Sequence, residues 1–335
     1  MAPVVIGGRY ILQNRLGGGG QGEVYEALDT NEGDVVAIKL LTTIPPGGPW
    51  AEARILRRLT DPHILPIRNA DVAAGQPYLV TDLAQHGTLE TRLNASGNCG
   101  LDVDDVVGWL RDACHGVARA QDVRLLHNDL KPANFFLDAR GECLVGDFGA
   151  ATLLPVGVTT VRPHAATAET AAPEIAAGWN TLAATASFRS DIYSLGASGY
   201  WMLAAQTPND FGGLTDVGAK MAVVAAQLPP RLRDVAPHVP TQVASTIERA
   251  MARDPNDRLA PRAADRRAPS PRCLLARRAR GRREHFRYLS RVGATVETAH
   301  RHDAARVEWK PHHQGLSRHA TTEVGASDSS RHTTT

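Results

Sequence analysis

The sequence predicts an α+β protein with two lobes, the first rich in β-strands and the second mostly helical. Two observations favour this fold class. Residues 9–42 alternate apolar and polar side chains between glycines, a pattern typical of strands joined by turns. From Leu101 onward, apolar residues recur at the spacing of amphipathic helices. Two such regions in one chain favour a ligand site between them.

Strands account for most of the first lobe. A strand and a glycine-rich turn are expected from residue 9, followed by strands at Glu23–Asp29, Val35–Leu41, Ile64–Ile67 and Pro77–Leu83. Residues 51–59 carry Ile55, Leu56 and Leu59 on one helical face, so a helix is expected there. Prolines at positions 45, 46 and 49 exclude the preceding loop from that helix.

Helices account for the second lobe. Val103–Ala120 is amphipathic and begins with an acidic turn, which stabilises a helix N-terminus. Ser190–Ala205 and Val239–Ala252 are also expected to be helical. The longest apolar run, near Leu195–Ala205, is too short to cross a bilayer, and the N-terminus does not resemble a signal peptide. We therefore expect a soluble, cytoplasmic protein without a membrane partner.

The cysteines point to the same compartment. None of the four belongs to a C-x-x-C pair, and they are widely spaced: Cys99, Cys114, Cys143 and Cys273. Free thiols in a reducing compartment are expected, rather than disulfides or a zinc site.

Charge divides the chain near residue 258. Residues 259–335 hold 16 Arg and Lys against 7 Asp and Glu, which leaves 21 and 28 in residues 1–258. The body therefore carries a net charge of −7 and the tail +9. The tail also lacks sustained apolar periodicity, so most of it is expected to be disordered. Three interpretations stay open: an arm that binds nucleic acid or acidic proteins, a plain extension, or a non-native reading frame.

The first two expected strands enclose a glycine-rich string: Gly17, Gly18, Gly19, Gly20, Gln21, Gly22, Glu23, Val24. Dinucleotide-binding folds use a similar string, but they need a helix directly after the glycines. Here a strand follows. Glycines let backbone N–H groups approach phosphate oxygens without a Cβ in the way. The context therefore favours a hairpin folded over phosphates.

The next strand carries Lys39, at the end of Val36-Ala37-Ile38-Lys39. The chain has 33 arginines and only four lysines, at positions 39, 131, 220 and 310. An ammonium group is a compact point charge, whereas a guanidinium is a broad fork, so the two are not interchangeable at a tight phosphate site. A rare lysine at this position therefore indicates a phosphate contact.

Three further strings follow in order. The first is His127-Asn128-Asp129-Leu130-Lys131-Pro132-Ala133-Asn134, the second is Asp147-Phe148-Gly149, eighteen residues after Asp129, and the third is Ala172-Pro173-Glu174. With the glycine-rich string and Lys39, they resemble the motifs of Hanks-type (eukaryotic-like) serine/threonine protein kinases, most closely the bacterial members. The resemblance covers residues 9–260.

The resemblance implies a bilobal protein kinase fold and an enzyme that transfers the γ-phosphoryl group of Mg-ATP to Ser and Thr hydroxyls of protein substrates. It divides the chain into a lead (1–8), an N-lobe (9–80), a hinge (81–84), a C-lobe (85–260) and the basic tail (261–335). Nucleic acid is not an expected partner, except through that tail.

The resemblance also assigns catalytic roles. Lys39 would pair with Glu52 and hold the α- and β-phosphates of ATP. Asp129 would accept or orient the proton of the substrate hydroxyl, and Lys131, beside the transferred group, favours Ser/Thr substrates. Asn134 and Asp147 would bind Mg²⁺.

Other positions receive supporting roles. Glu174 would pair with Arg258, Asp191 would brace the catalytic loop through backbone N–H groups, and Thr167 would position the substrate beside Asp129. The nucleotide would contact residues 17–22, with Val24 and Ala37 as the roof of the adenine pocket, Phe136 as its floor, Thr81 as gatekeeper, and Asp82, Leu83 and Ala84 as hinge. Four positions match the internal spine: Leu56, Ile67, His127 and Phe148.

Position 128 departs from the family pattern. Regulated kinases carry Arg there, and it meets a phosphate on the activation loop. Because this chain has Asn128, we hypothesise that its activity does not require phosphorylation of that loop.

Two other functions fit parts of the sequence. A pseudokinase, acting as a nucleotide-binding scaffold, is the main alternative. Every chemistry position is filled, which argues against it: Lys39, Glu52, Asp129, Asn134 and Asp147. Small-molecule phosphotransferases of kinase-like fold generally lack the Ala-Pro-Glu string and a lysine at the Lys131 position, and both are present here.

Overall fold

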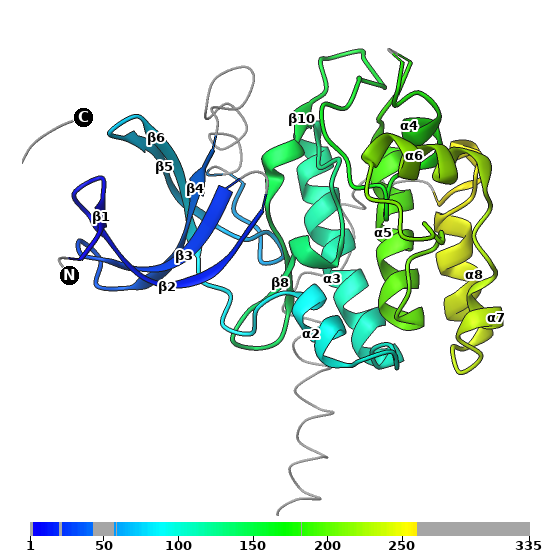
Figure 1. Cartoon of the computed structure of the whole chain (residues 1–335), viewed down its shortest axis with the longest axis horizontal. Helices are drawn as coiled ribbons and strands as arrows, with labels where there is room; N and C mark the ends of the chain where they lie inside the picture. The colour runs from blue at the N-terminus through cyan, green and yellow to red at the C-terminus, as the bar shows by residue number, and fades with distance from the viewer. Residues whose placement is uncertain (1–2, 20–21, 43–56, 58, 182, 260–335) are drawn as a thin grey trace, which may run out of the picture. The chain divides into compact units, whose positions relative to one another are not determined.

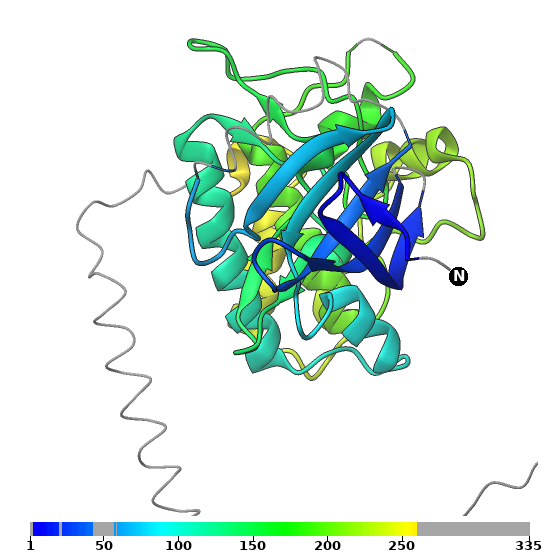
Figure 2. The same ribbon diagram turned by 90° about the vertical axis from the view of Figure 1, so that its left-hand side faces the viewer.

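An antiparallel β-sheet forms the first part of the computed structural model, which describes residues 3–19, 22–42, 57, 59–181 and 183–259 (Figure 1). Among those residues the sheet has six strands in the order β1-β2-β3-β4-β6-β5. They are β1 (Val5–Ile6), β2 (Tyr10–Gly19), β3 (Gly22–Asp29), β4 (Val35–Leu41), β5 (Ile67–Ala73) and β6 (Gln76–Asp82). Figure 2, turned by 90° from Figure 1, shows the twist of this sheet.

One face of the sheet forms a small core, and the opposite face carries Ala37 and Lys39. The buried cluster consists of Tyr10, Ala27, Val36, Ile38, Tyr78 and Val80. Successive side chains of a strand point to opposite faces, so the burial of Val36 and Ile38 directs Ala37 and Lys39 of β4 to the opposite face. The alternation in the sequence therefore sets the direction of Lys39.

The predicted strands at 23–29, 35–41 and 77–83 are confirmed to within one residue. The strand predicted at Ile64–Ile67 is wrong, because β5 begins at Ile67 and ends at Ala73. Ile64 forms only an isolated bridge with Val145, and Pro66 has no N–H to continue a ladder. The predicted helix at 51–59 falls largely outside the described residues.

Helices dominate the rest of the described chain. They are α2 (Leu89–Ala95), α3 (Val103–Asp122), α4 (Pro173–Ala177), α5 (Phe188–Ala204), α6 (Val217–Ala226), α7 (Leu232–Val235) and α8 (Thr241–Ala250). Short strands accompany them, namely β7 (Leu125–Leu126), β8 (Phe135–Leu137), β9 (Cys143–Val145) and β10 (Thr152–Leu153). The helices predicted at 103–120, 190–205 and 239–252 are confirmed as α3, α5 and α8, whereas α2, α4, α6 and α7 were not predicted.

Helix α5 is the centre of this second part, and it packs against both α3 and α8 (Figure 1). A Cβ added at Gly196 would lie 2.9 Å from the Cβ of Ala250, so glycine permits the close approach of α8. The apolar run near residues 195–205 is thus a core helix. No helix among the described residues is long and apolar enough to span a membrane.

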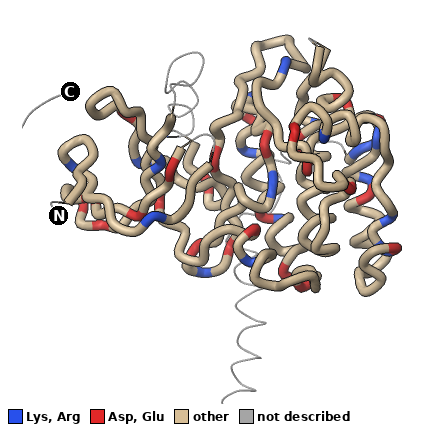
Figure 3. Tube along the Cα trace, viewed as in Figure 1, with Lys and Arg blue, Asp and Glu red and all other residues tan. Residues whose placement is uncertain are grey.

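Local sequence sets the helix ends. Asp102 accepts the backbone N–H groups of Asp104 and Asp105 at the start of α3. Ser187 and Ser190 form a capping box at the start of α5. Residues of both charges are interspersed along both parts of the described chain (Figure 3).

Candidate active site

An ion pair joins the sheet to the helical part. The Nζ of Lys39, on β4, lies 2.8 Å from Oδ1 and 2.9 Å from Oδ2 of Asp147. The two side chains are 16% and 28% exposed, so a ligand can still reach them. Two of the residues predicted to contact ATP phosphates and Mg²⁺ therefore meet in space.

Asp147 has an unusual backbone conformation, with φ 52° and ψ 65°. Left-handed conformations are uncommon for residues other than glycine and often occur at functional sites. The adjacent Phe148 is buried, and its ring packs 4.5 Å from that of His127. Burial by itself would raise the pKa of Asp147, but the charge and hydrogen bonds of Lys39 outweigh it, with help from His127 and Lys131. The pKa is lowered, and the carboxylate stays ionised at neutral pH.

A second cluster surrounds Asp129. Its Oδ1 accepts a 2.5 Å hydrogen bond from the Thr167 hydroxyl, and its Oδ2 lies 2.9 Å from the Nζ of Lys131. Lys131 also donates to the Thr167 hydroxyl oxygen, at 2.7 Å. Thr167 belongs to the segment from Asp147 to Glu174, which we call the activation segment. The predicted approach of Thr167 to Asp129 is confirmed.

Asn134 links the two clusters. Its Nδ2 donates to the backbone oxygen of Asp129 at 2.7 Å and to its carboxylate at 3.3 Å. The N–H of Gly146 donates to the backbone oxygen of Asn134 at 3.0 Å, which brings residue 134 next to Asp147. With its N–H groups so engaged, the Asn134 side chain has its oxygen left to bind a cation.

These oxygen donors fit Mg²⁺. Mg²⁺ prefers hard oxygen ligands and is usually bound by one or two carboxylates together with substrate phosphates and water. Within the described ranges, no group of three or more His, Cys, Asp or Glu could hold a metal ion. A cation held by Asp147 and Asn134 would therefore need phosphate oxygens as further ligands.

Asp191 braces the backbone at His127 and Asn128, just before Asp129. Its carboxylate accepts the backbone N–H groups of His127 and Asn128, each at 3.0 Å. The predicted brace is confirmed. Burial raises the pKa of Asp191, while His127 and the two N–H groups oppose the rise.

The glycine-rich residues form a hairpin between β2 and β3. Gly17 pairs with Val24, and Gly19 pairs with Gly22. Gly22 has φ 148°, and a Cβ there would collide with the carbonyl oxygen of Leu40. Only glycine fits that position. Gly20 and Gln21, at the tip, lie outside the described residues, as do Glu52 and Leu56.

The residues predicted to contact the adenine ring lie on adjoining segments of the chain. Ala37 pairs with Thr81 across β4 and β6, and Val24 pairs with Lys39 across β3 and β4. Phe136, on β8, packs against Gly146, where a Cβ would approach the ring to 2.8 Å. Ala84 follows β6 and accepts the N–H of Gly87 at 3.1 Å.

Arg68 bonds to Asp82 in the predicted hinge, a contact that was not predicted. Its Nε donates to Asp82 at 2.5 Å and its Nη1 donates to Asp34 at 2.7 Å, and these two bonds raise the pKa of Arg68. Arg68 lies on the edge strand that the sequence pattern misplaced, so no pattern pointed to this contact.

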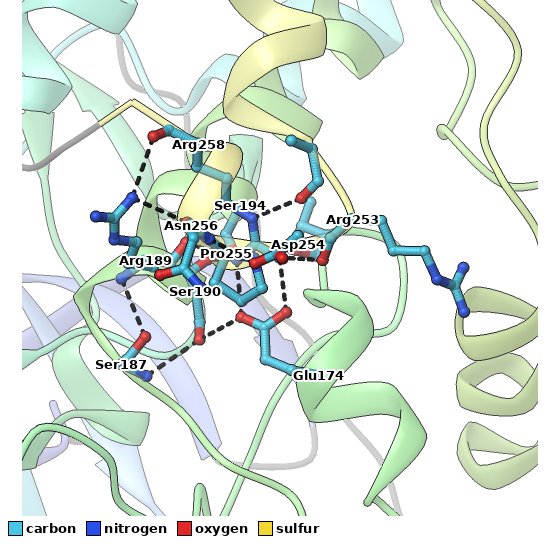
Figure 4. A network of polar contacts seen from close by, with 12 residues as sticks. Glu174, Ser187, Arg189, Ser190, Ser194, Arg253, Asp254, Pro255, Asn256 and Arg258 are labelled. Carbon is cyan, nitrogen blue, oxygen red and sulfur yellow. Dashed lines mark hydrogen bonds and ion pairs between the residues drawn. The ribbon is translucent and has the colours of Figure 1, made fainter.

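A buried ion pair joins Arg258, near the C-terminal end of the described residues, to Glu174 (Figure 4). The Arg258 side chain is fully buried and donates to both carboxylate oxygens of Glu174, at 2.8 and 2.7 Å. Its remaining N–H groups donate to the backbone oxygens of Arg189, Ala252 and Arg253. Every guanidinium donor is thus satisfied, and the predicted pair is confirmed.

Comparison with known proteins agrees with this geometry. The protein kinase domain family matches residues 10–267. Over 259 residues, covering 75% of the chain, the sequence is 30% identical to the serine/threonine-protein kinase PknL of Mycobacterium tuberculosis. The serine/threonine-protein kinases PknA and PknE of the same species are also 30% identical, over 266 and 262 residues and again 75% of the chain.

The matches cover only part of those relatives. The aligned region spans 62% of PknL, 58% of PknA and 44% of PknE. The family match itself covers well over half of this chain. The chain therefore belongs to the protein kinase domain family, within the group of bacterial Hanks-type serine/threonine kinases.

Proposed function

We propose that this chain is an active protein kinase that transfers the γ-phosphoryl group of ATP to serine and threonine hydroxyls of other proteins. The observation that carries the proposal is the cluster of Asp129, Lys131 and Thr167, with Asn134 bonded to the same aspartate. The names of the curated relatives support the same activity.

Asp129 is the proposed base of the reaction. The substrate hydroxyl oxygen attacks the γ-phosphorus, the bond from phosphorus to the β–γ bridging oxygen breaks, and Asp129 accepts the hydroxyl proton as ADP leaves. Lys131 offsets negative charge on the transferred group. Thr167 positions the substrate, since it already bonds to both Asp129 and Lys131.

The phosphates of ATP are proposed to lie between the glycine-rich hairpin and Asp147. Lys39 would contact the α- and β-phosphates, with Glu52 as its second partner, and residues 17–22 would supply backbone N–H groups. A Mg²⁺ ion held by Asp147 and Asn134, together with phosphate oxygens, would neutralise the charge on the phosphates.

The adenine ring is proposed to lie between the sheet and β8. Val24 and Ala37 would cover one side of it and Phe136 the other. Thr81 would limit the depth of the pocket, and the backbone of residues 82–84 would bond to the ring edge. The contact between Arg68 and Asp82 supports this assignment, because it holds that segment in place.

A reducing compartment such as the cytoplasm is part of the proposal. The described cysteines are free thiols, and they are Cys99, Cys114 and Cys143. Free thiols are typical of proteins kept in such a compartment.

A transfer assay tests the activity. Purified protein is incubated with radiolabelled Mg-ATP and a generic basic protein, and the labelled amino acids are identified. We expect phosphoserine and phosphothreonine from the wild type and none from Asp129→Asn, while calorimetry shows ATP binding by both. ATP binding without transfer by the wild type would instead identify a nucleotide-binding scaffold.

A further inference from the structure

We propose that Arg124 is a positioning residue that holds the activation segment in place without a phosphate group. The inference rests on the proposed kinase activity, and it names the residue that takes over the task of the arginine missing at position 128. Arg124 lies two residues after the end of α3 and directly before β7, and it contacts the activation segment near its start.

The backbone at Arg124 is the first observation. The residue has φ 62°, and its N–H donates to the carbonyl of Gln121 at 2.8 Å, as expected one position beyond a helix end. Glycine is the usual residue there, because a Cβ is crowded in the left-handed conformation. An arginine in this place indicates that its side chain offsets the strain.

The side chain supplies that compensation. Its Nε donates to the carbonyl of Leu154 at 3.0 Å, and its Nη2 donates to the carbonyls of Pro155 and Val158 at 2.6 and 2.7 Å. Residues 155–158 form a turn, closed by a 3.0 Å bond from the N–H of Val158 to the carbonyl of Pro155. One guanidinium therefore bonds to both ends of the turn.

Backbone contacts extend this attachment. The N–H of Leu154 donates to the carbonyl of Arg124 at 2.8 Å, next to the antiparallel pairing of β10 with β7. Arg124 thus both donates to and accepts from the same residue of the activation segment. The segment is fixed to the end of α3 by main-chain groups that are present whatever its phosphorylation state.

Asn128 adds a second point of attachment. Its Nδ2 donates to the carbonyl of Ala150 at 3.0 Å and to the hydroxyl of Thr152 at 3.1 Å. An arginine at this position would need an anion as partner, whereas the neutral amide bonds directly to the segment. Arg124 and Asn128 together hold residues 150–158, and neither contact involves a phosphate.

The attachment matters for the substrate site because Thr167 lies on the same segment. Thr167 bonds to Asp129 and Lys131, and Val161, between the two places, is bonded to Ala186 in both directions. Release of the turn at 155–158 would loosen one end of the stretch that carries Thr167. ATP contacts, which come from the sheet and from Asp147, would be affected much less.

Two variants of Arg124 test the inference. Arg124→Gly removes the side chain and suits the left-handed backbone, so it should fold. Arg124→Lys keeps the charge but loses the fork that reaches several carbonyls. We expect kcat/KM for a peptide substrate to fall by about tenfold or more in Arg124→Gly and by less in Arg124→Lys, with the ATP dissociation constant changed by less than about twofold.

Amide hydrogen exchange provides a readout that does not depend on activity. Exchange at residues 152–158 should quicken in Arg124→Gly and stay unchanged in Arg140→Gln. Arg140 is a matched control, since its side chain is 64% exposed and bonds to Asp138 and Glu142 in its own turn. Unchanged exchange in Arg124→Gly would overturn the proposal. If the wild type proves inactive, the exchange experiment still decides the role of Arg124.

A double-mutant cycle separates this role from phosphate binding. Thr159→Ala/Thr160→Ala should leave peptide kcat/KM within about twofold, and the loss from Arg124→Gly should be the same in both backgrounds. A loss from the threonine changes as large as that from Arg124→Gly, with no further loss on combination, would make Arg124 a receptor for a phosphothreonine and overturn the proposal.

Discussion

Lys39 and Asp147 are 108 residues apart in the sequence, and their side chains form a bidentate ion pair with distances of 2.8 and 2.9 Å. The pair places a compact cation and an ionised carboxylate side by side on the face of β4 opposite to its buried core. Such a pair can bind phosphate groups in two ways. The ammonium group attracts phosphate oxygens directly, and the carboxylate attracts them through a bound cation.

Replacement of Lys39 by Met should lower kcat/KM for protein phosphorylation by about 100-fold or more, because it removes the cation from the phosphate site. Replacement by Arg keeps the charge, but we expect it to restore little activity since a guanidinium fork does not fit a site built for an ammonium group. Steady-state kinetics measures both effects, and thermal unfolding checks that the variants are folded. Full activity of Lys39→Arg would contradict the geometric argument.

The lowered pKa of Asp147 leads to a prediction about stability. A carboxylate whose pKa is lowered by folding stabilises the folded state at pH values above its unfolded pKa, and this contribution disappears as pH falls through the folded pKa. The free energy of unfolding of the wild type, relative to Asp147→Asn, should therefore be most favourable near pH 7 and decline as pH falls below about 4.

Urea unfolding at a series of pH values measures this difference. The same series in a Lys39→Met background provides the control, because removal of the cation leaves burial to raise the pKa of Asp147. In that background the difference should change sign: the ionised, buried carboxylate should destabilise the folded state at neutral pH, and the free energy of unfolding relative to Asp147→Asn should rise as pH falls through the raised pKa. Identical profiles in the two backgrounds would show that Lys39 does not set the ionisation of Asp147.

The sequence predicted several contacts of the candidate site better than the details of the sheet. The strings around Asp129 and Asp147 are local, and their spacing survives any change in the loops between them. The brace from Asp191 and the pair of Glu174 with Arg258 were predicted through the family pattern and are present in the structure. The roles of individual site residues in binding ATP and Mg²⁺ stay predictions.

The features that the sequence did not predict, strand β5 and the contacts of Arg124, have physical causes. Edge strand β5 carries Arg68, Asn69 and Asp71, so it lacks the apolar alternation by which strands are predicted. The contacts of Arg124 depend on a left-handed backbone and on carbonyl groups thirty or more residues away. Neither a propensity nor a motif contains that information, because any residue can supply a carbonyl.

Loop phosphorylation should not be required for activity. Thr159 and Thr160 are exposed, and Asn128 already bonds to Ala150 and Thr152 of the activation segment through its neutral amide. We expect Thr159→Ala/Thr160→Ala to keep kcat within about twofold of the wild type. Mass spectrometry establishes which threonines carry phosphate in the wild-type sample. A large loss of kcat in the double variant would contradict this prediction.

Loss of the Glu174 partner should destabilise the fold strongly. Glu174→Gln leaves the fully buried guanidinium of Arg258 without its counter-charge, and breaking a buried pair in this way costs about 3–5 kcal/mol. Loss of Asp122, which pairs with Arg119 at the surface, should change stability by less than about 1 kcal/mol. Chemical unfolding of Glu174→Gln and Asp122→Asn gives the comparison, and equal losses would contradict it.

Gly22 and Gly108 form a matched pair of glycine positions with opposite expected outcomes. A Cβ at Gly22 would collide with the Leu40 carbonyl at a φ of 148°, whereas a Cβ at Gly108, within α3, meets nothing within 4 Å. Gly108→Ala should therefore stabilise the protein by about 0.5–1 kcal/mol, because alanine loses less backbone entropy in a helix. Gly22→Ala should instead destabilise it and distort the hairpin of β2 and β3.

The two variants also separate stability from nucleotide binding. If the hairpin covers the phosphates, Gly22→Ala should weaken ATP binding by about tenfold in calorimetry, since its backbone N–H groups move away from the ligand. Gly108→Ala, far from the hairpin in the sequence and on a helix of the other lobe, should bind ATP as the wild type does. Unchanged ATP affinity in a folded Gly22→Ala protein would mean that the shape of this hairpin does not determine how the phosphates are held.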